Sequence, residues 1–192
     1  MKSSLETKTY TPEEYLDLEV VSSERHEYIN GEIKLMTGGT PAHNEIVSNL
    51  LVALKLSLKA KPYRTFVTDQ RLWIPEKKLY TYPDIMVCPT PIQLQEGRTD
   101  TIINPCLVAE VLSKSTQDYD RGGKFLSYRT IETFTEYILI DQYRVYVEHY
   151  LKTASHQWLL SEYTDLNVEL TLDTINVKVK IADIYENIEL DN

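Results

Sequence analysis

Apolar positions recur at helical spacing in two stretches of the first sixty residues. A Thr-Pro pair at residues 11–12, followed by Glu14, combines a capping threonine, a first-turn proline and a capping-box glutamate. This start predicts a short helix that ends before Val20. Thr40-Pro41 begins a second helix, which we expect to continue to about residue 60 because its apolar side chains form one stripe. The stripe consists of Ile46, Val47, Leu50, Leu51, Leu54 and Leu58.

Between these helices the chain has the pattern of a β-hairpin. Residues 28–33 place Asn30-Gly31 at the centre of a short extended segment. Asn-Gly tolerates the positive φ values of a type I′ turn, which is the usual two-residue connection in hairpins. We therefore predict a hairpin about this pair.

From Arg64 onward the periodicity changes from helical to strand-like. Residues 65–74 and 85–88 predict two neighbouring strands, and the apolar run 106–112 is typical of a strand covered on both faces. A helix over residues 117–130 then leads to a strand over 137–140. This strand–helix–strand order implies a right-handed parallel crossover.

The remainder of the chain alternates as an antiparallel meander over residues 143–151 and 157–163. Internal repeats and linkers are missing from the sequence, so we expect one domain over residues 1–192 with its core at about 10–185. The predicted fold is α/β: a mixed β-sheet flanked by helices, with an antiparallel C-terminal extension.

Composition narrows the class of protein. At 192 residues and 42% hydrophobic content, the chain is long enough to bury a substantial core. Residues 1–10 are polar and unlike a secretory signal, and no apolar run approaches the roughly 18–20 residues that cross a bilayer. We expect a cytoplasmic protein without a membrane partner. Cys88 and Cys106 lie in apolar runs, which favours buried free thiols.

The net charge of −9 is unevenly distributed. Residues 132–192 hold 12 acidic and 4 basic residues, whereas residues 55–129 hold 12 basic and 8 acidic residues. Affinity for nucleic acid depends heavily on lysine and arginine. The mildly basic central segment therefore permits a polyanionic substrate, although it does not by itself favour one.

Glu110 interrupts an otherwise apolar strand. It shares a strand face with Val108 and Leu112, where an ionised carboxylate is costly unless it is paired or binds a metal ion. One interpretation is an ion pair with a lysine or arginine on a covering helix. The other is a functional carboxylate, and this residue alone does not separate the two.

Asp84 opens a second apolar strand directly after Pro83. Alone, Pro-Asp is more typical of a turn or a strand start. Two carboxylates at the ends of two core strands, however, form a site for a hard cation such as Mg²⁺, which takes one or two protein carboxylates and phosphate oxygens. We therefore predict that Asp84 and Glu110 bind Mg²⁺ or Mn²⁺.

Such a site needs a positive charge near the scissile phosphate. Leu112 occupies the position two residues after Glu110, where a lysine would complete a Glu-x-Lys pattern. Lys114 and Lys124 are the possible substitutes. We favour Lys124, because Gly122-Gly123 allows close helix–sheet approach and Lys124 shares its helix face with Tyr128.

Three segments together resemble a known family. They are Tyr80-Thr81-Tyr82-Pro83-Asp84-Ile85-Met86-Val87, then Asn104-Pro105 with Glu110-Val111-Leu112-Ser113, then Asp118-Tyr119-Asp120-Arg121-Gly122 with Lys124-Phe125 and Tyr128-Arg129. These segments are similar to the large prokaryotic family of putative restriction endonucleases within the PD-(D/E)XK nuclease superfamily. The similarity spans about residues 10–185.

The resemblance implies a restriction-endonuclease-like core in which Asp84 and Glu110 bind the metal ion. It also implies that Lys124, from the helix, replaces the missing strand lysine. Five further residues are weaker candidates for substrate binding or for supporting the metal site: His43, Glu45, Glu32, Gln70 and Lys114. Among them, His43 faces the apolar side of its helix, and we favour a core histidine there.

Two further acidic residues and several tyrosines have simpler interpretations. Asp118 and Asp120 fit the first turn of the helix, where the helix dipole favours them, better than they fit a role as metal ligands. Glu27 is a further candidate neighbour of the metal site, although a solvated or structural role is favoured. Tyrosines such as Tyr143 are able to stack on bases, but more often belong to a core or an interface.

The sequence thus predicts a metal-dependent endonuclease that hydrolyses phosphodiester bonds of nucleic acid, preferably DNA, and acts as a homodimer. The alternative is a catalytically inactive nuclease fold that binds nucleic acid or protein. Leu112 and the acidic net charge favour this alternative. A hydrolase of another phosphate ester is a third interpretation.

Overall fold

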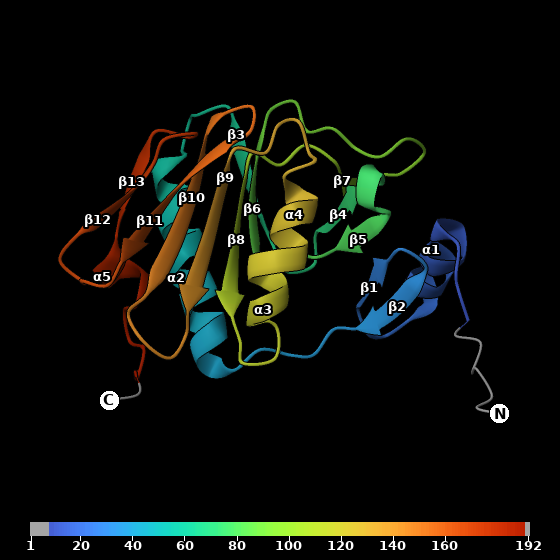
Figure 1. Ribbon diagram of the computed structural model, residues 1–192, viewed down its shortest axis with the longest axis horizontal. Coiled ribbons are helices and arrows are strands. Elements are labelled where there is room, and N and C mark those ends of the chain that lie inside the picture. Colours follow the sequence, from blue (N-terminus) through green and yellow to red (C-terminus); the bar gives the residue numbers. More distant parts are fainter. Residues whose placement is uncertain (1–7, 191–192) are drawn as a thin grey trace.

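A computed structural model describes residues 8–190 of the chain, and Figure 1 shows a large sheet with helices on both of its faces and a smaller sheet beside it. The first seven residues of the polar N-terminal segment lie outside the described range. Within that range, no helix has the length and apolar character required to cross a membrane.

The large sheet is mixed, as predicted. Its strands are arranged in the order β11–β10–β9–β8–β6–β3. The strands are β3 (Tyr63–Val67), β6 (Ile85–Pro89), β8 (Leu107–Leu112), β9 (Glu136–Asp141), β10 (Val147–Ala154) and β11 (Gln157–Tyr163). Only the β8–β9 pair is parallel, and the other pairs of this sheet are antiparallel. The predicted parallel strand pair across a helix is therefore confirmed.

One face of the large sheet packs on an aliphatic core. The covering elements are α2 (Pro41–Ser57), α5 (Ile181–Ile184) and the hairpin of β12 (Glu169–Leu172) and β13 (Val177–Lys180). The helical stripe of α2 supplies Ile46, Leu50 and Leu54, all fully buried. This core holds α2 rigidly, so that its first turn lies at a defined place beside the sheet.

The other face carries the crossover helix that joins β8 to β9. It begins with α3 (Gln117–Tyr119), continues through a π-helical turn, η2 (Asp120–Lys124), and ends with α4 (Phe125–Tyr128). Tyr128 is buried against the rings of Phe134 and Tyr137. Because α4 is anchored in this aromatic core, the π-helical turn lies directly over β8.

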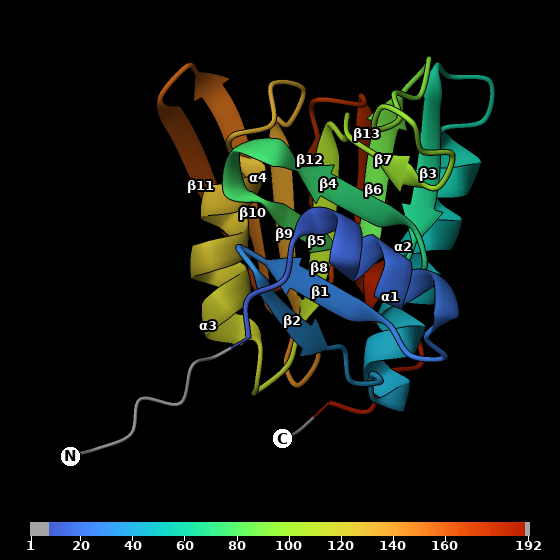
Figure 2. The same cartoon turned by 90° about the vertical axis from the view of Figure 1, so that its right-hand side faces the viewer.

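The smaller sheet has the strand order β2–β1–β5–β4–β7. Its strands are β1 (His26–Ile29), β2 (Glu32–Leu35), β4 (Arg71–Ile74), β5 (Leu79–Thr81) and β7 (Thr101–Ile102), with a 3₁₀ turn, η1 (Pro75–Lys77), before β5. The predicted hairpin is confirmed: Asn30 and Gly31 have φ values of 48° and 99° between β1 and β2. Figure 2 shows this sheet and α1 (Pro12–Val21) in front of the large sheet.

The prediction of one strand over residues 65–74 is wrong. β3 pairs with β6 in the large sheet, whereas β4 pairs with β5 and β7 in the smaller one. The chain turns between them, where Thr68 has a φ of 39°. The turn between the two strands carries neither glycine nor proline, so the sequence does not mark it. The interval 89–104, whose polar sequence is typical of a loop, contains β7.

Candidate active site

Asp84 and Glu110 lie side by side at one end of two neighbouring strands. β6 and β8 pair through Ile85 and Ala109, which places the preceding Asp84 opposite Glu110. The Asp84 N–H donates to Glu110 Oε2 at 3.2 Å, and the Val111 N–H donates to Asp84 Oδ2 at 2.8 Å. Backbone hydrogen bonds thus hold both carboxylates in place. The Asp84 side chain is 19% exposed, whereas Glu110 is only 3% exposed.

The π-helical turn brings an ammonium group to this pair. Lys124 Nζ lies 3.2 Å from Glu110 Oε1 and 3.2 Å from Asp120 Oδ1. Tyr128 donates to the same Glu110 oxygen at 2.7 Å. Of the two lysines considered from the sequence, the structure therefore places Lys124, and not Lys114, at Glu110.

Asp120 and Glu27 complete a carboxylate shell around Lys124. Asp120 is 2% exposed and meets the ammonium group from within the same π-helical turn. Glu27 reaches Lys124 Nζ at 3.6 Å from β1 in the smaller sheet, and its carboxylate accepts a hydrogen bond from Thr81. The ammonium group therefore joins the crossover helix to both sheets. In the sequence, only Lys124, four residues later, indicated a partner for Asp120.

Burial and charge act in opposite directions on Glu110. Burial raises the pKa of its carboxyl group to about 8, with Lys124 lowering this pKa and Asp84 raising it. Burial also opposes the charge of Lys124, but Glu110, Glu27 and Asp120 together raise the lysine pKa well above its ordinary value. The lysine is therefore protonated. A further positive charge between Asp84 and Glu110 would relieve their mutual repulsion.

His43 contacts the same carboxylate pair from the first turn of α2. Its Nε2 lies 3.1 Å from Asp84 Oδ1, so the preferred prediction of a core histidine is wrong. Burial lowers the pKa of His43, but the hydrogen bond and the charge of Asp84 outweigh this and raise the pKa above its ordinary value. The ring lies against the chain at Gly39, where an added Cβ would be 2.7 Å from the imidazole.

Comparison with known proteins identifies the family of this chain. A family model described as "putative restriction endonuclease", Uma2, matches residues 12–182. The chain belongs to the Uma2 family. The resemblance noted in the sequence is thereby confirmed.

Two curated relatives of this Uma2 chain come from Synechocystis sp. The uncharacterised protein sll1609 is 40% identical over 171 residues, which cover 89% of this chain and 97% of the relative. The uncharacterised protein slr1290 is 34% identical over 178 residues and covers 93% and 92%, respectively. A crystal structure of a putative nuclease of DUF820 from Anabaena variabilis matches with a TM-score of 0.74 at 19% identity. It covers 92% of this chain and 97% of its own and confirms the α/β fold.

The remaining candidates of this Uma2 chain lie away from the carboxylate pair. Glu32 is exposed on β2, and Gln70 donates to the backbone carbonyls of Arg71 and Asp100. Glu45 lines a cavity beside α2, and the Lys114 ammonium lies 5.0 Å from the centre of the Tyr143 ring. Thus His43 is the only one of the five weaker candidates that contacts Asp84 or Glu110 within residues 8–190.

The donor set fits a hard divalent cation. No group of three or more His, Cys, Asp or Glu residues in the described part of the chain is arranged to hold a metal ion. Mg²⁺, however, commonly takes only one or two protein carboxylates and completes its shell with water and phosphate oxygens. Asp84 and Glu110 present such oxygens next to each other, and their mutual repulsion favours a cation between them.

Proposed function

We propose that this protein is a metal-dependent endonuclease that hydrolyses phosphodiester bonds of nucleic acid, with DNA as the preferred substrate. The observation that carries the proposal is the convergence of Asp84 and Glu110 beside the Lys124 ammonium group. Membership of the Uma2 family supports it.

Asp84 and Glu110 would hold Mg²⁺ or Mn²⁺ through carboxylate oxygens. When bound, such an ion lowers the pKa of a coordinated water and neutralises charge that develops on the phosphate. Asp84 is the more exposed of the two and faces the substrate side, while Glu110 lies beneath it. His43, hydrogen-bonded to Asp84, orients that carboxylate.

Lys124 acts on the nucleophile side of this site. The Lys124 ammonium has three N–H groups, more than Glu110 alone accepts. The carboxylates of Glu27 and Asp120 keep this ammonium group charged and hold it in place. A fixed ammonium orients an attacking water or stabilises charge on the phosphate without reorganising during the reaction. This positioning needs both sheets, since Glu27 comes from β1.

Plasmid cleavage with Mg²⁺ tests the proposal. Asp84→Ala and Lys124→Ala should each lower the rate by at least two orders of magnitude, as expected when a metal ligand or a charge stabiliser is removed. Lys77→Ala, at an exposed lysine on η1, is the matched control and should cleave like the wild type. Equal cleavage by all four proteins would assign the activity to a contaminant and contradict the proposal.

A non-catalytic binding module is the second candidate function. It is favoured by one observation: Glu110 already has Lys124 and Tyr128 as partners, as in a structural ion pair. Calorimetric titration with Mn²⁺ separates the two functions. The nuclease requires binding heat in the wild type and its loss in Glu110→Gln, whereas the binding module predicts no heat in either protein.

The proposal also places the protein in the cytoplasm and includes a homodimer. A dimer fits the substrate because a duplex has two strands to cut. In support, β11 is an edge strand of the large sheet with Leu159 and Leu160 exposed. Light scattering at micromolar concentration would give twice the chain mass for a dimer. A single-chain mass would remove this part of the proposal.

A further inference from the structure

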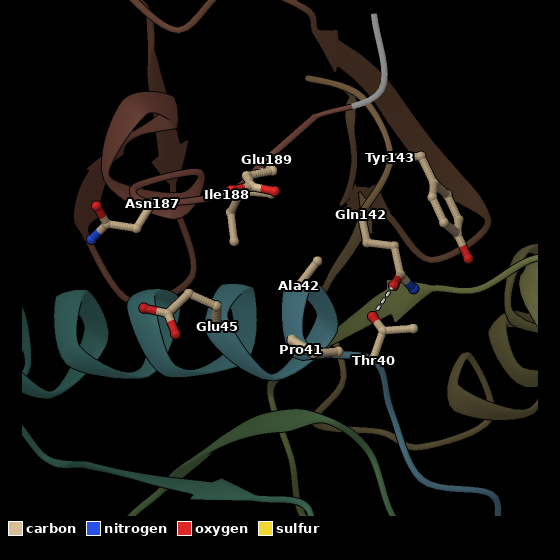
Figure 3. A pocket seen from close by; sticks show the side chains of 9 residues that line it. All are labelled: Thr40, Pro41, Ala42, Glu45, Gln142, Tyr143, Asn187, Ile188 and Glu189. Carbon is tan, nitrogen blue, oxygen red and sulfur yellow. Dashed lines mark hydrogen bonds between the residues drawn. The ribbon is translucent and has the colours of Figure 1, made fainter.

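A cavity next to the candidate active site is lined by Glu45 and lies beside Lys114, two of the weaker sequence candidates that do not contact Asp84 or Glu110. It has a volume of about 430 Å³ and lies between the start of α2, the turn after β9 and the C-terminal segment. Glu45 and Tyr143 line it, and Lys114 lies over the Tyr143 ring. The volume falls within the usual range of small-molecule sites. Figure 3 shows Gln142 and Tyr143 on one side and Glu45 and Asn187 on the other.

The cavity shares structural elements with the active site. Thr40 and Gln142 line the cavity and are hydrogen-bonded to each other (Figure 3). Gln142 also donates to the carbonyl of Leu112 at 2.7 Å, two residues beyond Glu110 on β8. On α2, the cavity-lining Ala42 directly precedes His43, which contacts Asp84. A nucleic-acid strand whose phosphate binds at Asp84 would therefore place the neighbouring nucleotide next to this cavity.

The lining selects a base and not a phosphate. Glu45 and Glu189 are carboxylates, which repel phosphate oxygens but accept hydrogen bonds from amino groups. Cytosine, adenine and guanine carry an exocyclic amino group, whereas uracil and thymine present carbonyl oxygens. Tyr143 adds an aromatic ring of the kind on which an unstacked base packs. The positive charge of Lys114 lies at this ring, at the margin of the carboxylate-lined space.

We propose that the cavity binds an unstacked, amino-bearing nucleobase of the nucleotide next to the cleaved phosphate. The base stacks on Tyr143, its amino group donates to Glu45, and Lys114 contacts the adjoining phosphate. This inference rests on the proposed nuclease function and specifies its substrate: a strand with a base outside the stack at the cleavage position.

Cytidine and uridine 5′-monophosphate are matched probes, because the amino group of one replaces a carbonyl of the other. Binding to the metal-free protein is measured from amide shifts in NMR titrations. Cytidine monophosphate should shift Gln142, Tyr143 and Asn187 and bind at least fivefold more tightly than uridine monophosphate. Glu45→Gln and Tyr143→Ala should each weaken cytidine monophosphate at least fivefold. Tyr143→Phe keeps the ring and should bind like the wild type, as should Glu132→Gln at an exposed glutamate.

Equal binding of the two nucleotides, shifts elsewhere on the protein, or unchanged affinity in Glu45→Gln and Tyr143→Ala would each overturn the inference. The dispersion of the same spectra reports whether every variant is folded. Plasmid cleavage by the wild type separates this failure from failure of the nuclease function. A protein that cuts DNA without binding either nucleotide refutes the cavity's role alone. A protein that binds cytidine monophosphate without cutting refutes the nuclease function, and the cavity is then a nucleobase site that serves no cleavage.

Discussion

Glu110 shows how one side chain couples stability to the proposed chemistry. It is buried among apolar neighbours on β8 and has three partners: Lys124, Tyr128 and the N–H of Asp84. Removing a partner from a buried ion pair is strongly destabilising, because the remaining charge is left uncompensated. The same energetic cost favours binding of a cation to the Glu110 carboxylate. On the side that faces Asp84, the cation would replace the water that burial removes from this carboxylate.

The pH dependence of stability follows from this burial. The pKa of Glu110 is raised from 4.5 to about 8 in the folded protein, so the folded state binds more protons than the unfolded state between these values. The free energy of unfolding contributed by Glu110 must then fall as pH rises through this interval. In metal-free buffer, the free energy of unfolding of the wild type, relative to that of Glu110→Gln, should fall across this pH interval by on the order of 1–4 kcal/mol in total.

Urea unfolding from about pH 4.5 to about pH 8 measures this difference. Gln keeps the side-chain size and still accepts from Tyr128, so it isolates the titration. If the two proteins change in parallel with pH, Glu110 does not titrate in this interval and the argument from its burial fails.

The crossover helix is interrupted by a π-helical turn. Its π-helical turn, η2, directs Asp120 and Lys124 to the same side, toward β8. π-Helical turns within α-helices are frequently found at functional sites. Gly123 lies on this turn against the Tyr119 ring, where an added Cβ would be 2.6 Å from the ring edge, whereas Gly122 has open space around it.

These two glycines form a matched pair for mutation. Gly122→Ala should raise the free energy of unfolding by about 0.5–1 kcal/mol, since alanine is the better helix former and meets no neighbour. Gly123→Ala gains the same propensity but must displace Tyr119, so it should be less stable than Gly122→Ala by about 1–3 kcal/mol. Urea unfolding of both variants measures this order. Equal stability would show that the Tyr119 ring moves freely.

Across the whole molecule, charge is separated along the sheet. The acidic C-terminal part forms β9 to β13 and α5 at one side of the molecule, and the smaller sheet lies at the opposite side (Figure 1). Two exposed lysines lie beside aromatic rings near the candidate active site. Lys34 lies 5.9 Å from the Tyr119 ring centre, and Lys114 lies 5.0 Å from that of Tyr143. The proposed affinity for nucleic acid should therefore depend on few phosphate contacts.

Few phosphate contacts predict a weak dependence of binding on salt. With two or three contacts, the logarithm of the association constant should fall against the logarithm of salt concentration with a slope of roughly −2 to −3. Fluorescence anisotropy of a labelled oligonucleotide without divalent metal measures it. Lys34→Ala and Lys114→Ala should each reduce the slope by roughly 1. A wild-type slope steeper than roughly −6 would require a basic surface that these lysines do not provide.

Local patterns predicted much of the architecture. Capping residues predicted α1, and capping residues together with apolar periodicity predicted α2, because these features act within a few residues of the chain. The anomaly of a carboxylate in an apolar strand pointed to Glu110 for the same reason. The division of residues 65–74 between two sheets was not predictable this way, since pairing partners and not local alternation decide it.

Only the tertiary structure decided which charges meet. Glu27 and His43 come from a strand and a helix that are far apart in sequence, and each pattern alone favoured a solvated, structural or core position. Glu27 lies 3.6 Å from Lys124 and His43 lies 3.1 Å from Asp84 because packing of the two sheets and α2 brings these elements together. The chemistry of each side chain was readable from its type, whereas its partner depended on long-range packing that one-dimensional periodicity does not encode.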